Sequence, residues 1–154
     1  MARKEIDLNR YFNEWMKKAK MLNEKREKLI RETMDFYLDI LKTILGFGID
    51  TVALANYTVV DSRRKKYEIE DAIIIEEGKP YYVDFRREIK IPLEDEEDLR
   101  DALHALFSEI IILRNHDRIL LHLARELRKS LSTGGKHVKK LTKRISSREL
   151  EEPI

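Results

Sequence analysis

The chain has 154 residues, enough for one domain with a hydrophobic core, and its charged residues (39%) nearly cancel to a net charge of +2. Because cysteine is absent, disulfides, thiolate zinc sites and cysteine nucleophiles are excluded. The sequence has no apolar run of about 18 residues, and residues 1–5 lack an apolar signal core. We therefore expect a cytoplasmic protein with no membrane partner.

The composition also indicates the kind of organism. Glutamine is absent and glycine is scarce, whereas Lys, Arg and Glu are abundant. This bias is typical of hyperthermophile proteins, in which ion-pair networks replace thermolabile amides. We expect a hyperthermophilic, archaeal source.

The first expected element is a long helix over residues 7–46. Apolar residues recur at helical spacing from Leu8 to Ile44, and Gly46 and Gly48 supply the stop. Residues 23–28 are wholly polar, so a bend or break there is the alternative. We favour one continuous helix because neither proline nor glycine interrupts the pattern.

Residues 51–91 predict a three-stranded antiparallel meander, with strands over 51–60, 67–76 and 81–91. In the last strand, alternation puts one set of residues on an apolar face that a helix must cover, and the other set on a polar face. The apolar set is Tyr81, Val83, Phe85, Ile89 and Ile91, and the polar set is Tyr82, Asp84, Arg86, Glu88 and Lys90.

A second long helix is expected over residues 95–131. Its heptad positions are spaced four and three residues apart, and all but Asp117 are apolar: Leu99, Leu103, Leu106, Ile110, Leu113, Asp117, Leu120, Ala124, Leu127 and Leu131. Such spacing produces one apolar stripe of roughly 50 Å. Asn and Asp at 115–117 favour a helix start, which leaves a helix pair as the alternative. We favour continuity because the heptad stays in phase across this point.

These elements predict an α+β domain over residues 1–133, with the two long helices packed antiparallel. That packing suggests a buried Arg26–Asp117 pair that fixes the helix register. Residues Ile111, Ile112, Ile119, Leu121 and Leu123 lie off the stripe, so they must meet the sheet or another subunit. Residues 134–154 are expected to form a flexible basic tail.

The charges are segregated along the chain. Acids dominate residues 94–101, whereas residues 125–148 contain nine Lys or Arg and one acid. Such blocks favour contact with a polyanion, and single strands additionally need flat side chains for stacking. The candidate nucleic-acid-binding residues are Arg63, Arg64, Lys65, Lys66, Tyr82, Arg86, Arg87, Lys136, Lys139, Lys140, Lys143 and Arg144.

One constellation resembles the core of the PD-(D/E)XK metal-dependent nucleases. Asp71 precedes Glu88-Ile89-Lys90, and Asp84-Phe85-Arg86 is an alternative second motif. The resemblance implies two carboxylates that hold a cation and a lysine that steadies the attacking water. The chain departs from that pattern because alternation puts Asp71 on the apolar face and no proline precedes it. His122 and Glu126, one helical turn apart, could ligate a metal but lack a third ligand.

The patterns together favour a non-catalytic accessory protein, without cofactor or metal, that contacts the backbone of single-stranded DNA or RNA without sequence specificity. It would act as an oligomer or as a small subunit of a nucleoprotein complex. The helical body with a small β segment is similar in layout to the small subunits of archaeal CRISPR surveillance complexes. The alternative is a protein–protein interaction module, such as a viral or plasmid-encoded inhibitor. Either reading uses the leftover apolar surface of the 99–131 helix for a protein partner or self-association.

Overall fold

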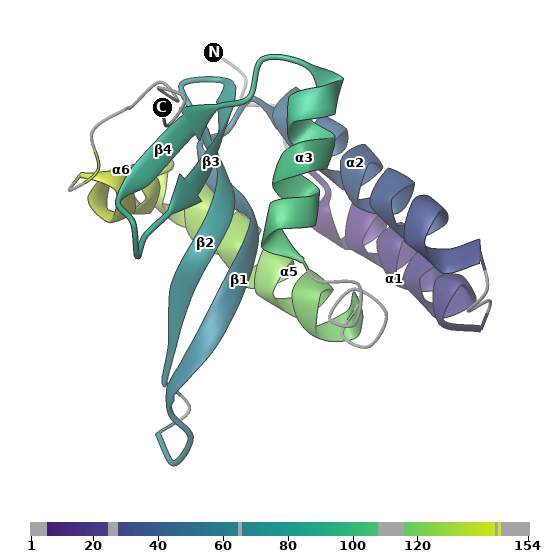
Figure 1. The fold of residues 1–154 in the computed structure, drawn as a ribbon. Helices are drawn as coiled ribbons and strands as arrows, with labels where there is room; N and C mark the ends of the chain where they lie inside the picture. The colour runs from purple at the N-terminus through teal and green to yellow at the C-terminus, as the bar shows by residue number, and fades with distance from the viewer. Residues whose placement is uncertain (1–5, 25–27, 65, 108–115, 144, 146–154) are drawn as a thin grey trace.

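The computed structural model describes residues 6–24, 28–64, 66–107, 116–143 and 145. These residues form an α+β fold with five helices and one four-stranded antiparallel sheet of order β1-β2-β3-β4 (Figure 1). The predicted fold class is therefore confirmed, although several of the predicted elements are divided differently. No helix in the described ranges has the length and apolar character needed to cross a membrane.

The predicted helix over 7–46 is two helices, α1 (Leu8–Glu24) and α2 (Leu29–Phe47). Lys28, just before α2, has φ −102° and ψ 14°, outside α-helical geometry. The two helices lie side by side (Figure 1) and share one core, in which Trp15 and Ala19 of α1 and Met34 of α2 are buried. A straight helix would leave these apolar stripes without a partner, so burial outweighs the local helical preference of the polar segment. The predicted glycine stop is confirmed, since Gly48 caps α2 with φ +69°.

The prediction of one continuous third strand is also wrong. It is two strands, β3 (Lys79–Asp84) and β4 (Ile89–Pro92), which follow β1 (Thr51–Asp61) and β2 (Lys66–Glu76). The Asp84 carboxylate accepts the backbone N–H groups of Arg86 (3.0 Å) and Arg87 (3.2 Å), which turns the chain. Because of this turn, Lys90 pairs with Val83 across the ladder. The predicted polar face is therefore wrong for Lys90, which lies on the same face as Val83.

Apolar side chains on both faces of the sheet are buried, where alternation predicted only one apolar face. On one face Leu54, Ile73 and Ile75 join the core formed with α1, α2, α3 (Glu96–Leu106) and α5 (His116–Thr133). On the other face a smaller core contains Val52, Ala72, Ile74, Val83, Val138 and Ile145. The sheet is thus the middle layer of the molecule.

The predicted second long helix is also divided, which rejects the continuous 95–131 helix. After α3 the backbone of Phe107 is extended, with φ −120° and ψ 124°, and α5 begins at His116. Heptad residues of both helices are buried in the same core, including Leu103 and Leu127, but they lie on different helices. Ile119 and Leu123 are buried as well, so the leftover apolar surface of α5 shrinks to Leu121 and Leu131. Ile110–Leu113 and the Arg26 side of the predicted Arg26–Asp117 pair lie outside the described residues.

The predicted flexible tail contains a packed helix, α6 (Lys136–Thr142). Val138 is fully buried, and the Thr142 hydroxyl donates to Glu76 of β2 at 3.1 Å. Val138, Leu141 and Ile145 recur at helical spacing over a segment that is too short to predict packing. The second face of the sheet gives these residues a surface to cover. Helix α6 belongs to the folded domain, and residues 146–154 lie outside the described part of the chain.

His116 forms an unusual polar contact in the helical core. Its side chain is 1% exposed, its Nδ1 is hydrogen-bonded to the Tyr37 hydroxyl at 2.8 Å, and its ring stacks on the Tyr37 ring. Its Nε2 is buried without a hydrogen-bond partner among the described residues. Burial lowers the pKa of His116 below its ordinary value of 6.5, and Asp117 opposes this shift.

We predict that Gly135→Ala destabilises the protein more than Gly134→Ala. Both glycines have positive φ, which costs a non-glycine residue about 1–2 kcal/mol. Only at Gly135 would the new Cβ lie 2.6 Å from Asp50 Cβ, whereas nothing lies within 4 Å at Gly134. Urea unfolding should therefore show an additional loss of about 1–3 kcal/mol for the Gly135 variant. Equal losses would contradict the packing of the α5–α6 turn on Asp50.

We also predict that stability falls on acidification because of His116. The folded pKa is lowered, so the unfolded chain binds a proton that the folded chain does not, and stability is lost as pH falls through about 6.5. The melting temperature should fall between about pH 7 and pH 5 by less in His116→Phe than in the parent. Leu121→Phe, at an exposed position of α5 without a titratable group, should keep the parental slope. Identical slopes in all three proteins would reject this role of His116.

Candidate nucleic-acid interface

Strands β1 and β2 continue beyond the rest of the sheet as a two-stranded ribbon. β3 pairs with β2 only from Asp71 to Glu76, whereas β1 and β2 remain paired from Tyr57↔Ile69 to Asp61↔Lys66. We call residues 57–69 the arm. Figure 1 shows the arm projecting away from the helices and from β3 and β4. The arm starts at a β-bulge, where Glu70 is the unmatched residue between the pairs Asn56↔Asp71 and Tyr57↔Ile69.

Basic residues lie at the tip of the arm, and one carboxylate shapes the turn. Asp61 Oδ1 accepts the backbone N–H groups of Arg63 (3.0 Å) and Arg64 (3.4 Å), and Asp61 Oδ2 lies 3.8 Å from Arg64 Nε. Arg63, Arg64 and Lys66 are exposed, and Lys65 lies outside the described residues. The Asx-type turn therefore presents three described cations to solvent.

Two further cations lie at the base of the arm. The turn between β3 and β4 is tied to the arm by a hydrogen bond from the Phe85 N–H to the Glu70 carbonyl (2.9 Å). In this turn Arg86 pairs with Glu70, and Arg87 lies 3.9 Å from Asp84. Both arginines are mostly exposed. The fold thus joins Arg86 and Arg87 to the arm, about 13 Å along β2 from the tip.

The predicted basic residues of the tail form a separate surface. Lys136, Lys139, Lys140 and Lys143 are exposed on or beside α6. Helix α6 contacts the opposite end of β2, at Glu76, which lies about 33 Å along the strand from Lys66. Arg144 lies outside the described residues. The candidate bases therefore form two groups, one on the arm and one on α6.

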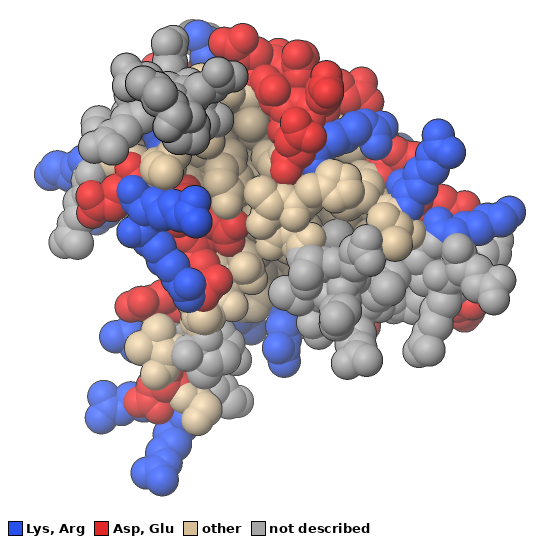
Figure 2. Space-filling view, viewed as in Figure 1, with Lys and Arg blue, Asp and Glu red and all other residues tan. Residues whose placement is uncertain are grey.

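The surface charges are polarised. Acidic side chains gather over the N-terminal end of α3, where Glu94, Asp95, Glu96, Glu97 and Asp98 follow one another (Figure 2). They favour the N-terminal end of the helix dipole, and Asp95 caps α3 by accepting from the Asp98 N–H. Lys and Arg side chains project from the arm and around the β3–β4 turn, where acidic side chains lie among them, and a further group of basic side chains lies over α1 and α2. The arm lies at the end of the molecule away from the acidic surface over α3.

Tyr82 makes a hydrogen bond to a neighbouring strand. Its hydroxyl donates to Asp71 Oδ2 at 2.7 Å, and the side chain is half-buried. Burial raises the pKa of Tyr82, and the Asp71 carboxylate adds to the shift. Asp71 itself is 8% exposed, and burial raises its pKa against the opposing hydrogen bond from Tyr82. We therefore assign Tyr82 a structural role as the partner of Asp71.

The residues of the nuclease-like pattern are not assembled into one site. Asp71 lies on the face of Tyr82, whereas Lys90 lies on the opposite face, where it pairs with Glu76 and sits 4.4 Å above the Tyr81 ring. Glu88 is exposed in the β3–β4 turn with φ +54°. In the alternative motif, Asp84 caps the turn and Arg86 pairs with Glu70. The register of β2 and β3 does pair Asp71 with Asp84, so two carboxylates of the alternative motif share one face, but Lys90 lies on the other.

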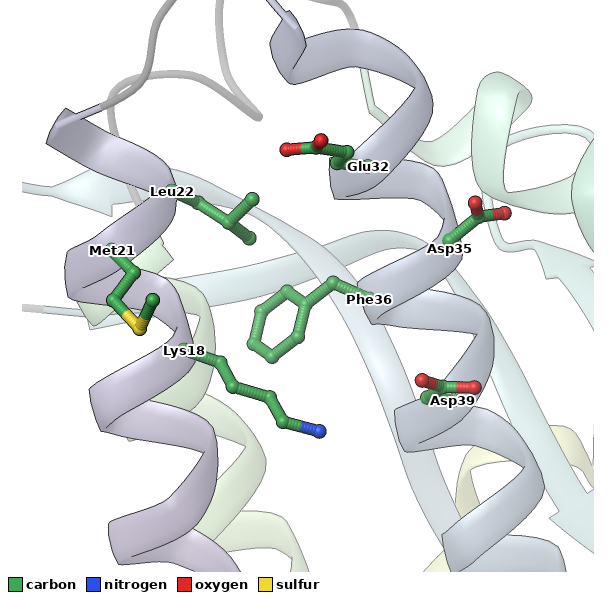
Figure 3. A pocket seen from close by; sticks show the side chains of 7 residues that line it. All are labelled: Lys18, Met21, Leu22, Glu32, Asp35, Phe36 and Asp39. Carbon is green, nitrogen blue, oxygen red and sulfur yellow. The ribbon is translucent and has the colours of Figure 1, made fainter.

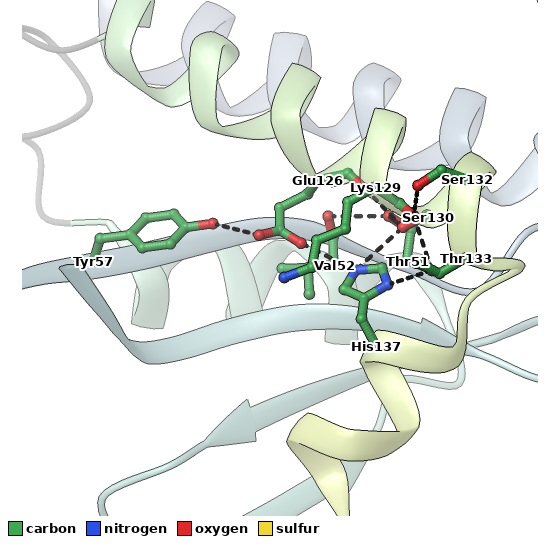
Figure 4. A network of polar contacts seen from close by, with 9 residues as sticks. All are labelled: Thr51, Val52, Tyr57, Glu126, Lys129, Ser130, Ser132, Thr133 and His137. Carbon is green, nitrogen blue, oxygen red and sulfur yellow. Dashed lines mark hydrogen bonds and ion pairs between the residues drawn. The ribbon is translucent and has the colours of Figure 1, made fainter. Parts of the chain in front are cut away.

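A buried polar network joins α5, β1 and α6 (Figure 4). Ser130 donates to Thr51 (2.6 Å), and His137 Nε2 lies 3.1 Å from Glu126 and 3.4 Å from Ser130. Glu126 also accepts the Tyr57 hydroxyl at 3.3 Å. Serine and glutamate thus share one imidazole nitrogen, whereas a catalytic triad places them on opposite nitrogens. The network fixes α6 to the sheet, which the sequence pattern did not predict.

The same network bears on the predicted His122–Glu126 metal pair. Glu126 is engaged by Tyr57 and His137, and the His122 ring stacks on Tyr57 at 4.2 Å between ring centroids. Burial lowers the pKa of His122, and Arg125 and Arg118 reinforce the shift. Within the described ranges no three His, Asp or Glu side chains are placed to hold a metal ion.

A groove of about 300 Å³ lies between α1 and α2 (Figure 3). Leu22, Met21 and Phe36 supply its apolar surface, while α2 contributes three carboxylates and α1 one ammonium group. These charged residues are Glu32, Asp35, Asp39 and Lys18. Asp35 is already paired with Arg100 at 2.9 Å. The groove is amphipathic and solvent-open, as is common at protein contact surfaces.

Comparison with known proteins gives no relative: no family model, no curated protein and no solved structure matches this chain.

We predict that Tyr82→Phe destabilises the protein, whereas Tyr81→Phe does not. Removing the Tyr82 hydroxyl takes from the buried Asp71 carboxylate the hydrogen bond that its Oδ2 accepts, at a cost of about 1–3 kcal/mol. Tyr81 makes its described contact with Lys90 through the ring, which phenylalanine retains. Urea unfolding at neutral pH measures both variants. Equal stability of the two would show that Asp71 does not depend on Tyr82.

Proposed function

We propose that this protein binds nucleic acid through phosphate contacts made by the arm, without reading the bases. It acts as a non-catalytic accessory protein, as an oligomer or as a small subunit of a nucleoprotein complex. The observation that carries the proposal is the ribbon itself, which extends beyond the packed sheet and presents Arg63, Arg64 and Lys66 at its tip. An extended element that buries little surface but exposes several cations is suited to a polyanion.

Electrostatics support this use of the arm. Among the described residues, Arg63 and Lys66 have no ion-pair partner, and Arg64 pairs only with the carboxylate that shapes its own turn. The acidic surface at the N-terminal end of α3 lies away from the arm (Figure 2). A polyanion is repelled from that end and attracted to the arm, so the charge distribution orients the encounter.

A protein–protein module remains the second candidate, supported by the α1–α2 groove. Met21 in this groove is 59% exposed, and Leu121 and Leu131 of α5 are also exposed. These side chains supply apolar contact surface for another protein or for a second copy of the chain. In a nucleoprotein complex the two roles are compatible, because the groove and the arm are separate parts of the molecule.

We predict that the variant Arg63→Ala, Arg64→Ala, Lys66→Ala loses most of its affinity for nucleic acid. Parental binding should weaken steeply between about 50 and 200 mM salt, because phosphate contacts release counterions. The triple variant should reduce the slope of log K against log salt by about 2 to 3. Fluorescence anisotropy with a labelled oligonucleotide measures both quantities.

The matched control removes the same charge elsewhere. Lys139→Ala, Lys140→Ala, Lys143→Ala takes three cations from the α6 surface and should change the affinity far less. Equal losses in the two variants would mean that net charge, not the arm, drives binding. Parental affinity in the arm variant would reject the arm as the interface.

A further inference from the structure

The aromatic side chains bear on which polymer the arm contacts. Binding of single strands relies on exposed aromatic rings on which bases stack. Three aromatics of the sheet are otherwise engaged: Tyr57 stacks on His122, the Tyr81 ring lies beneath Lys90, and the Tyr82 hydroxyl is bonded to Asp71, while the side chain of Tyr67 lies outside the described part of the structure. The large apolar side chains exposed in the described ranges are all aliphatic, namely Met21, Ile30, Val60, Leu121 and Leu131. The described surface therefore offers cations without a stacking platform.

The dimensions of the arm suit a duplex. A two-stranded β-ribbon fits the major groove of B-form DNA, which is about 12 Å wide and about 8.5 Å deep. The paired part of the arm, from Tyr57 to Asp61, is about 13 Å long, so a ribbon that lies across the groove spans it from one strand to the other.

The spacing of the cations points in the same direction. The tip residues Arg63, Arg64 and Lys66 are separated from Arg86 and Arg87 at the base by about 13 Å along β2. This separation is close to the width of the groove, so the two groups can contact the phosphates of opposite strands.

We infer that the nucleic acid is duplex DNA and that the arm enters its major groove, with the tip cations and the β3–β4 turn cations on phosphates of the two strands. This inference rests on the proposed function and names its ligand. A-form RNA has a deep, narrow major groove that excludes such a ribbon. Asp61 and Glu68 on the arm are repelled by phosphates, which keeps the contact weak and free of base preference.

The test compares four ligands with the full chain: duplex DNA of about two helical turns, each of its single strands, and the same sequence as duplex RNA. Anisotropy titrations at one salt concentration should give duplex DNA an advantage of about tenfold or more over the single strands and duplex RNA. Replacing residues 58–68 with Asn-Gly, which closes a two-residue hairpin on the Tyr57↔Ile69 pair, should abolish this preference. Circular dichroism checks that the shortened protein is folded, and the α6 triple variant should retain the preference.

The possible outcomes are distinct. Equal or tighter binding to single strands overturns the duplex assignment but leaves the proposed function intact, and equal binding to duplex RNA overturns the assignment to DNA. Binding to none of the four ligands overturns the proposed function itself. Competition separates the grooves: a major-groove ligand such as methyl green should displace the protein, whereas netropsin in the minor groove should not. The opposite pattern would place the arm in the minor groove and reject the inference.

Discussion

The fold depends on burying strand β2 on both faces at once. The run Ala72–Ile75 is at most 1% exposed, so successive side chains enter opposite cores. One face requires the helical layer of α1, α2, α3 and α5, and the other requires α6 and Ile145. Since each fully buried Ile stabilises by roughly 1.5–3 kcal/mol, this short run is the strongest local reason for the three-layer arrangement. It also explains why α6 is packed although its own sequence is largely basic.

The same strand determines where the arm begins. Its buried run ends at Asp71, where β3 also stops pairing, and beyond that point the sequence of β2 turns polar. The bulge at Glu70 and the Asp71–Tyr82 hydrogen bond occupy this boundary. The ribbon therefore projects because the strands remain paired after their apolar partners end. A bulge at its base increases the local twist and sets the direction of the arm.

The sequence could predict the fold class, the regions of all four strands and the glycine stop after α2, because these follow from periodicity and local turn chemistry, although it joins β3 and β4 into one strand. It predicts the break between α1 and α2 and the helix start at 115–117 only as alternatives to continuous helices, and the structure confirms both alternatives. Each break lies in a chain segment that permits a helix locally, and it follows from tertiary burial of two stripes in one core. For the site, the sequence identifies the basic residues but not their positions in space. Their division into an arm group and an α6 group could not be predicted, because it depends on the length of β1 and β2 and on the turn between β3 and β4. Alternation alone treats β3 and β4 as one strand.

The arm base shows how an electrostatic site can be both ordered and available. Arg86 and Arg87 each pair with an acid, Glu70 and Asp84, and both acids also serve the backbone of the same turn. Exposed ion pairs contribute only about 0–1 kcal/mol, so exchanging a carboxylate for a phosphate costs little. The acids would therefore hold the arginines in place before binding, and the arginines would exchange these carboxylates for phosphates on binding. At the tip, Asp61 accepts the backbone N–H groups of Arg63 and Arg64 and forms an ion pair with Arg64. Under the proposed function, such a pairing favours weak and rapidly reversible binding to a charged backbone.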